Sequence, residues 1–360
     1  MTRFQILASA FVLAYEKEEK RALTDLLGCS QRELVESALK QADFSAARET
    51  NSSHNPKVVV STAACGLSKE DWQNWLASGK RALQDCYGNV IGLLSEEEPG
   101  NESFEQWTEK QDLQLEKEDT FALSFPGVLD MASLAQVLRL LRLRINKHWM
   151  EEGVRLDDPE RIEISPFAKI GKFSYLEGDV KVLGETVLGD EVFVSHGSVI
   201  KDSEIGPRCR IYSSLIESST MEEGADIGPY SHLRPQAHLG KGVHIGNFVE
   251  VKKASLGQGT KAGHLAYIGD ADVGSNVNIS CGVIFCNYDG KKKHRTTVGN
   301  DAFLGSNANL VAPVTVEDEG FVAAGSTITK KVEEGALAVE RSEQKTISGY
   351  VKRKKDAGLL

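Results

Sequence analysis

The chain has 360 residues, of which 41% are hydrophobic and 26% charged, and its formal net charge is −10 at pH 7. This composition is ordinary for a globular protein of about two domains, and the negative charge argues against a general nucleic-acid or membrane-surface binder. The basic run Lys352–Lys355 is a local exception, which we interpret as a solvated terminus rather than a phosphate-docking segment. The six cysteines include no Cys-x2-Cys pair, so we expect free thiols in a reducing cytoplasm and no metal site.

Residues 1–150 are predicted to form a small mixed α/β domain that ends in a long helix. Its expected elements alternate strand and helix along the chain, at Ile6–Ala14, Gln31–Ala42, Lys57–Ser61, Lys69–Leu83 and Asn89–Leu94. The run Ile6–Ala14 resembles a signal-peptide core, but the charged segment Glu16–Arg21 follows it, and we favour a buried strand. The long helix begins after Asp130, with apolar residues on one face, and ends near Gly153. No run reaches the ~18–20 apolar residues that would span a bilayer.

An apolar residue recurs, mostly every six positions, from Ile164 to Ile328. The first members of the series are Ile164, Ile170, Leu176, Val182, Leu188, Val194 and Ile200. A period of six fits neither a helix nor a hairpin, but it fits short strands that meet at corners, where glycine permits the bend. Three such sides make one coil, so the pattern predicts a parallel β-helix of roughly nine coils. We assign residues 151–332 to this domain and residues 333–360 to a C-terminal tail.

One insertion interrupts the repeat between Phe285 and Val298 and must leave the β-helix as a loop. Asp289-Gly290 favours a turn in this loop. The loop also carries four cations, Lys291, Lys292, Lys293 and Arg295. Loops on a rigid scaffold often hold binding groups, and these charges suit an anionic ligand.

Four motifs point to a family. They are Arg234–Ala237, Gly246–Ala254, Lys261–Ala271 and Cys286–Gly290. This set resembles the acetyltransferase half of the bifunctional GlmU-type enzyme, a glucosamine-1-phosphate acetyltransferase and N-acetylglucosamine-1-phosphate uridylyltransferase. The resemblance runs from about Leu143 to Lys345. It implies a left-handed β-helix, acetyl-CoA as co-substrate without a metal, and a homotrimer.

The resemblance also implies roles for individual residues. His264 corresponds to the general base. The family's ligands of the sugar phosphate correspond to Arg234, Lys252, Tyr267, Asn278 and Lys293. The coenzyme contacts, some of them made by the backbone, correspond to Cys281, Asn287, Tyr288, Ser306, Ala324 and Arg341.

These residue types suit acetyl transfer to an amine. An ammonium has no lone pair with which to attack a thioester, so a base is needed to take the proton. Histidine, with an ordinary pKa of about 6.5, is suited to this role. The thioester oxygen gains charge during the attack and needs fixed donors, for which the Tyr288 backbone N–H and Ser306 are candidates. A sugar phosphate needs cations, and Arg234 offers a planar fork while Lys252 offers a point charge.

Other interpretations of these residues are weaker. His232, His238 and His244 recur every six residues and could suggest a metal site, but that spacing puts them on three different faces of the β-helix. Cys281 and Cys286 could suggest an acyl-enzyme thiol, but no base adjoins them in the sequence, and packing or coenzyme contact is the better interpretation.

The N-terminal region departs from the family pattern. A nucleotidyltransferase would carry a glycine-rich phosphate loop here, whereas Leu13–Arg21 contains no glycine. We therefore interpret residues 1–150 as a degenerate nucleotidyltransferase-like domain without uridylyltransferase activity. The predicted function is N-acetylation of glucosamine 1-phosphate in UDP-N-acetylglucosamine biosynthesis, in the cytoplasm. Two alternatives remain: an acetyltransferase for another amino sugar or sugar nucleotide, and a catalytically silent scaffolding or regulatory homologue.

Overall fold

The computed structural model describes residues 131–359, five short strands of the N-terminal region, and Asn74, Trp75 and Ser78. The chain divides into two compact units, residues 1–208 and 209–360. None of the helices in the described residues is long and apolar enough to cross a membrane.

A five-stranded mixed sheet forms the described part of the N-terminal region. Its strands run in the order β1-β2-β4-β3-β5, with the bounds β1 Gln5–Ile6, β2 Lys57–Val60, β3 Ala82–Gln84, β4 Val90–Ser95 and β5 Thr120–Ala122. Strand β4 is antiparallel to β2 and β3, while β1–β2 and β3–β5 are parallel. The strands predicted near residues 57 and 90 are confirmed.

Two of the N-terminal predictions need comment. The helix predicted over Lys69–Leu83 extends too far, because Ala82–Gln84 pairs with strands on both sides and this pairing overrides the helical pattern. Helical residues are described at positions 74, 75 and 78, where the Trp75 side chain is buried. The helix predicted at Gln31–Ala42 and most of the strand Ile6–Ala14 lie outside the described residues.

The long helix is confirmed as α5, Met131–Glu151. Its end is fixed by Gly153, which has φ 92 and lets the chain turn back so that the Val154 N–H donates to Trp149 O at 2.9 Å. The buried Asn146 Nδ2 donates to Pro159 O at 2.6 Å and to Ile162 O at 2.9 Å. The helix is thereby joined to the first coil of the repeat.

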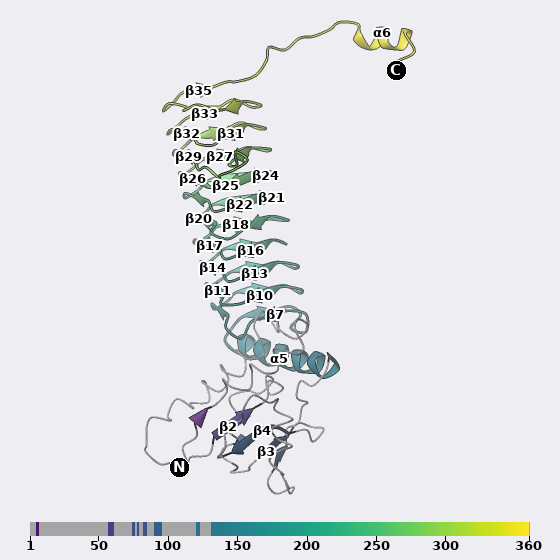
Figure 1. The fold of residues 1–360 in the computed structure, drawn as a ribbon, viewed down its shortest axis with the longest axis vertical. Coiled ribbons are helices and arrows are strands. Elements are labelled where there is room, and N and C mark those ends of the chain that lie inside the picture. The colour runs from purple at the N-terminus through teal and green to yellow at the C-terminus, as the bar shows by residue number, and fades with distance from the viewer. Residues whose placement is uncertain are drawn as a thin grey trace. The chain divides into compact units, whose positions relative to one another are not determined.

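The first unit continues as parallel coils (Figure 1). Its strands form three sheets, β7-β10-β13, β8-β11-β14 and β6-β9-β12. The bounds are β6 Arg155–Leu156, β7 Glu163–Ile164, β8 Lys169–Ile170, β9 Tyr175–Leu176, β10 Lys181–Leu183, β11 Val187–Leu188, β12 Phe193–Val194, β13 Val199–Lys201 and β14 Glu204–Ile205.

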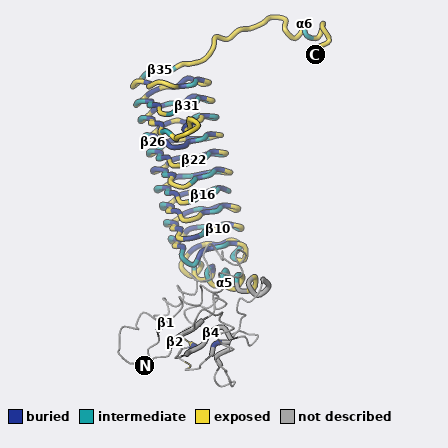
Figure 2. Tube along the Cα trace, in the orientation of Figure 1, coloured by how far each residue is buried: buried dark blue, intermediate teal, exposed yellow. Residues whose placement is uncertain are grey.

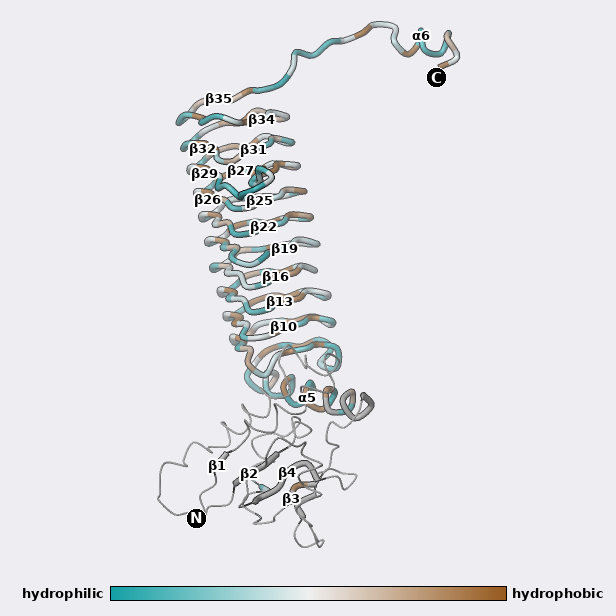
Figure 3. Tube along the Cα trace, viewed as in Figure 1, coloured by the Kyte–Doolittle hydropathy of each residue, from teal (hydrophilic) through white to brown (hydrophobic). Residues whose placement is uncertain are grey.

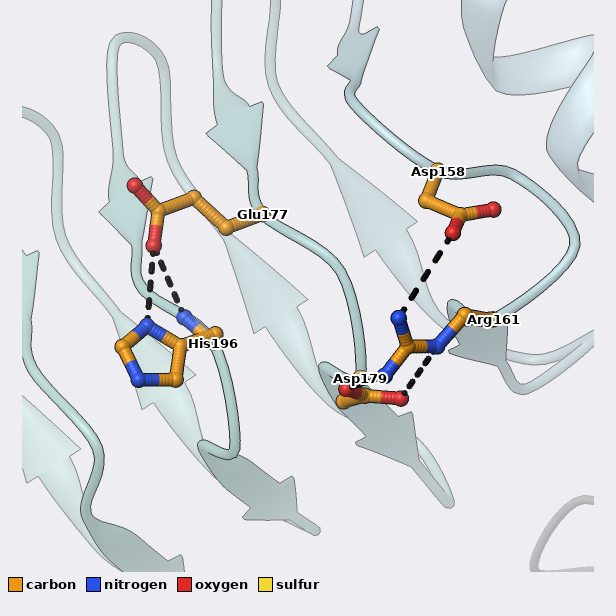
Figure 4. A network of polar contacts seen from close by, with 5 residues as sticks. All are labelled: Asp158, Arg161, Glu177, Asp179 and His196. Atoms are coloured by element: carbon orange, nitrogen blue, oxygen red, sulfur yellow. Dashed lines mark hydrogen bonds and ion pairs between the residues drawn. The ribbon is translucent and has the colours of Figure 1, made fainter.

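Polar pairs join neighbouring coils along the rim of this unit (Figure 4). Arg161 Nε donates to Asp179 Oδ1 at 2.9 Å, and its Nη1 lies 3.9 Å from Asp158 Oδ2. The Glu177 carboxylate accepts the His196 backbone N–H at 3.0 Å. Pairs this exposed contribute about 0–1 kcal/mol each to stability, so they are not the main interaction that holds the coils together.

The second unit repeats the same three-sided arrangement. Its sheets are β16-β19-β22-β25-β28-β31-β34, β17-β20-β23-β26-β29-β32 and β15-β18-β21-β24-β27-β30-β33-β35. The bounds are β15 Arg210–Ile211, β16 Leu215–Glu217, β17 Thr220–Met221, β18 Asp226–Ile227, β19 His232–Leu233, β20 His238–Leu239, β21 His244–Asn247, β22 Glu250–Lys252, β23 Ser255–Leu256, β24 Lys261–His264, β25 Tyr267–Gly269, β26 Ala271–Val273, β27 Asn278–Ile279, β28 Ile284–Cys286, β29 Thr296–Val298, β30 Phe303–Leu304, β31 Asn309–Val311, β32 Val314–Val316, β33 Phe321–Val322, β34 Thr327–Ile328 and β35 Leu337–Ala338. An exposed tail with helix α6, Tyr350–Asp356, follows.

The apolar ladder accounts for this fold. The repeating residue of almost every strand of the β-helix is buried, and the coils alternate between buried and more exposed positions (Figure 2). Each repeating residue pairs with its equivalent one coil away, as Leu233 does with Val251 and Val251 with Ile268. The residues before it point outward and are mostly polar, which gives the alternating hydropathy seen along the coils (Figure 3). This stacking of parallel strands in three sheets is the parallel β-helix predicted from the sequence.

Candidate active site

The predicted site residues of the second unit gather around one corner of the β-helix, between the sheet that contains β24 and the sheet that contains β25. We call it the site corner and define it by the equivalent positions of five successive coils: Asn247, His264, Cys281, Ser306 and Ala324. Backbone hydrogen bonds join its turns. Leu265 N–H donates to Asn247 O at 3.0 Å, and Gly282 N–H to Leu265 O at 3.1 Å. Asn307 N–H donates to Cys281 O at 2.9 Å.

A cation cluster lies on the sheet that contains β25. Arg234 follows β19, Lys252 ends β22 and Lys293 belongs to the inserted loop. The Lys293 ammonium, and after it the Arg234 guanidinium, hold the pKa of Lys252 below its usual value. Arg234 Nη1 donates to Glu250 Oε1 at 2.8 Å, and this bond raises the pKa of Arg234. Three neighbouring cations, with Glu250 and more weakly Glu217 acting on Arg234, suit a ligand with more than one negative charge.

His264 ends β24 with an exposed imidazole. Its Nδ1 lies 2.8 Å from Asn247 Oδ1, one coil away. Tyr267 starts the next strand, β25, so the cation cluster and the imidazole occupy adjoining sides of the site corner.

Tyr267 and Asn287 are joined to a buried carboxylate. Asn287 Nδ2 donates to Asp270 Oδ2 at 2.6 Å and to the Tyr267 hydroxyl at 3.3 Å, and both Asn287 and Asp270 are buried. Gly269 makes this contact possible, because a Cβ there would lie 2.5 Å from the Tyr267 hydroxyl and 2.6 Å from Asn287 Nδ2. With both N–H groups engaged, Asn287 presents only its Oδ1 to a ligand.

The inserted loop is held by its own hydrogen bonds. Asp289 Oδ1 accepts the Lys291 and Lys292 backbone N–H groups at 2.7 Å each, and its Oδ2 lies 2.7 Å from His294 Nε2. These contacts, the Lys292 N–H foremost, lower the pKa of Asp289 well below its usual value. The His294 N–H donates to Asn287 O at 2.8 Å. The loop that carries Lys293 is therefore preorganised.

The remaining predicted residues lie on the following coils. Gly325 N–H donates to Ser306 O at 2.8 Å, and Arg341 Nη1 donates to Ala324 O at 2.9 Å, which brings the start of the tail to the site corner. Tyr288 is exposed in the loop. Asn278 starts β27, where its Nδ2 donates to Ser280 Oγ at 3.0 Å. No hydrogen bond or ion pair among the described residues joins Asn278 to the cation cluster.

The alternative metal site is not formed. His232, His238 and His244 belong to three different sheets and pair separately with Glu217, Glu222 and Asp226. Within the described residues no group of three or more histidine, cysteine or acidic side chains could hold a metal ion. Burial raises the pKa of the Cys286 thiol, which disfavours the thiolate that an acyl-enzyme would need.

Three residues of the site were not singled out in the sequence: Asn247, Glu250 and Asp270. All three lie inside the motifs Gly246–Ala254 and Lys261–Ala271. A signal for Asn247 existed, because aligning the repeats places it one coil before His264. Asn287 lies in the inserted segment, so the six-residue period does not predict its hydrogen bond with Asp270.

Comparison with known proteins agrees with the resemblance for the C-terminal part of the chain. The chain is 47% identical over 227 residues to the bifunctional protein GlmU of Listeria welshimeri, a match that covers 63% of this chain and 50% of that protein. It is 44% identical over 227 residues to that of Shouchella clausii, and 49% identical over 221 residues to that of Alkaliphilus metalliredigens. The chain thus spans about half the length of the curated relatives it matches. No family model matches.

Solved structures show a weaker likeness. An Arabidopsis UDP-N-acetylglucosamine acyltransferase is 15% identical, with a TM-score of 0.34, over 56% of this chain and 76% of its own. LpxA from Acinetobacter baumannii is 14% identical, with a TM-score of 0.28, over 52% of this chain and 71% of its own.

Proposed function

We propose that the second unit transfers the acetyl group of acetyl-CoA to the amine of glucosamine 1-phosphate, in the pathway to UDP-N-acetylglucosamine. One observation carries the proposal: an exposed imidazole ends a strand on one side of the site corner, the cation cluster belongs to the sheet on the other side, and the turns of Cys281, Ser306 and Ala324 lie on the following coils. The similarity to bifunctional GlmU proteins supports the same reaction.

The cation cluster would bind the phosphate. Arg234, Lys252 and Lys293 converge although their charges repel, and a phosphate dianion would relieve that repulsion. The Tyr267 hydroxyl, fixed by Asn287, would contact the sugar. This arrangement favours a phosphorylated amino sugar over a neutral one.

His264 would act as the general base. The neutral amine nitrogen attacks the thioester carbon, and its proton passes to His264 Nε2. The carbonyl π electrons move to oxygen, where the Tyr288 backbone N–H and Ser306 would stabilise the charge. When the C–S bond breaks, the coenzyme thiolate takes the proton from the imidazolium, so the histidine returns to its starting state. No step needs a metal.

The coenzyme would lie along the site corner. Cys281, Ser306 and Ala324 occupy successive coils there, and Arg341 reaches the last of them. Asn287 would accept a hydrogen bond through Oδ1. We include Asn278 as a ligand of the sugar phosphate on the strength of the resemblance.

We also propose a cytoplasmic homotrimer whose sites lie between neighbouring subunits. Three large apolar side chains are exposed next to the site corner: Tyr230 is 65% exposed, Phe248 53% and Leu265 58%. The Tyr230 and Phe248 rings stack with centroids 5.8 Å apart. A second copy of the chain would cover this surface, which is otherwise costly to leave in water.

The test is a thiol-release assay with acetyl-CoA and a panel of amino sugars. We expect release with glucosamine 1-phosphate, and His264→Ala should lower kcat by roughly 10²–10⁴-fold while changing the KM for acetyl-CoA little. His238→Ala is the matched control, because His238 also pairs with an acidic residue but on another sheet. Near-normal turnover by a properly assembled His264→Ala protein would show that the base lies elsewhere. No release with any amino sugar would favour a silent homologue.

A further inference from the structure

The imidazole of His264 can act as a base only through a ring nitrogen that carries a lone pair. Its Nδ1 lies 2.8 Å from Asn247 Oδ1, and an amide oxygen can only accept a hydrogen bond. Nδ1 must therefore carry the proton, and the lone pair is left on Nε2.

We infer, on the premise of the proposed function, that Asn247 is a positioning residue that holds His264 as the Nδ1–H tautomer and aims Nε2 at the amine. Asn247 does not touch the substrate. It acts through the imidazole, and it accepts the Nδ1–H bond both before and after Nε2 gains its proton, so the ring need not turn during the reaction.

The backbone is built to hold this pair. Strands β21 and β24 have four residues each, whereas every other strand of the second unit has two or three. The extra length brings Asn247 into register with His264. Gly246, the residue before Asn247, approaches the neighbouring coil so closely that a Cβ would lie 1.8 Å from Gly263 O. Leu265 N–H then donates to Asn247 O at 3.0 Å and closes the turn.

The neutrality of Asn247 also matters. A carboxylate at this place would stabilise the imidazolium and raise the pKa of the base, so that more of the enzyme would be protonated at neutral pH. An amide orients the ring without adding that charge. We expect the acid limb of the kcat/KM profile to report this difference.

The first experiment needs no substrate. Histidine labelled with ¹⁵N distinguishes a protonated ring nitrogen from one with a lone pair, and the His264 signals among the eight histidines are identified by their loss in His264→Ala. In the neutral wild-type ring Nδ1 should be protonated. In Asn247→Ala the Nε2–H form should dominate, as in free histidine, and Asn247→Asp should restore the Nδ1–H form.

The second experiment measures kinetics. Asn247→Ala should lower kcat roughly 10- to 100-fold, the usual effect of losing the group that orients a functional histidine, with little change in either KM. Asn247→Asp should recover most of kcat but shift the acid limb to higher pH. Asn309→Ala is the control, because Asn309 also bonds a side chain one coil away, Thr327 Oγ1 at 3.3 Å.

The outcomes separate the two proposals. A lone pair on Nδ1 in the wild type, or an Asn247→Ala protein with unchanged tautomer, kcat and pH profile, overturns the role of Asn247 and leaves the proposed function standing. If the wild type acetylates no amino sugar, the proposed function fails, and the tautomer measurement still decides whether Asn247 sets the ring.

Discussion

Two glycines stacked beneath the site should respond in opposite ways to the same substitution. A Cβ on Gly246 would lie 1.8 Å from Gly263 O and 2.6 Å from Gly263 C, whereas a Cβ on Gly263 meets nothing within 4 Å. Neither glycine has a positive φ, so the comparison isolates the contact between coils. Gly246→Ala and Gly263→Ala are therefore a matched pair.

The expected cost of Gly246→Ala follows from what must move. The two coils have to separate by roughly 1.5 Å at this point to restore an ordinary van der Waals contact. Overpacking of this kind costs about 1–3 kcal/mol, and stretching the bond from Leu265 N–H to Asn247 O adds about 0.5–1.5 kcal/mol. We expect a loss of about 1.5–4.5 kcal/mol in the free energy of unfolding. Gly263→Ala should instead be neutral or stabilising by up to about 1 kcal/mol, because it restricts the unfolded chain.

Urea denaturation of the wild type and both variants, followed by circular dichroism, measures the difference. The same proteins assayed for thiol release should show that Gly246→Ala also loses turnover, since the displaced strand carries Asn247. Equal urea midpoints for the two variants would refute the reasoning, because only the Cβ added in Gly246→Ala would collide with the neighbouring coil.

Further predictions concern the site, the oligomeric state and the N-terminal region. Lys252→Gln should raise the KM for the sugar phosphate about tenfold, and it should stabilise the ligand-free protein slightly in thermal melts by removing repulsion from Lys293 and Arg234. Because the pKa of Lys252 is lowered, its charge is lost at a lower pH than usual, so the wild-type KM should begin to rise at a correspondingly lower pH. Asp270→Ala should raise the KM for acetyl-CoA several-fold and lower stability by about 1–3 kcal/mol in urea titrations, because one of the two N–H groups of the buried Asn287 loses its acceptor. Light scattering at micromolar concentration should give a trimer mass, and a monomer mass would exclude the proposed interface. UTP, magnesium and N-acetylglucosamine 1-phosphate should release no pyrophosphate above background, whereas enzyme-dependent release would overturn the interpretation of residues 1–150 as inactive.

The part of the fold that depends on one local rule was predictable. A period of six assigns each apolar residue to the interior, and burial of Ile245, Ala262 and Ile279 on successive coils follows without any knowledge of distant contacts. The helix α5 was equally predictable, because its apolar face and the glycine at its end are local sequence signals. The helix predicted over Lys69–Leu83 ran too far because β-pairing partners far along the chain decide the state of its last residues.

The shared corner of several predicted site residues follows from the repeat, but the contacts between them do not. Aligning the repeats places His264, Cys281 and Ser306 at one corner, as the structure does. The period cannot say which outward side chains bond one another, since that depends on rotamers and on the insertion. The contact of Asn287 with Asp270 and the contact of Arg234 with Glu250 therefore emerge only in three dimensions.

The equivalent positions of the site corner repeat at a fixed spacing along the β-helix. Adjacent strands of a sheet lie about 4.8 Å apart, so the distance from His264 to Ala324, three coils later, is about 14 Å along the β-helix. Adding or removing one whole coil between them would change this distance by about 4.8 Å. The contacts inside the β-helix would still be of the same kind. Substitutions can change the side chain at each position, but the distance from His264, the proposed base, to the far end of the proposed coenzyme site can change only by whole coils.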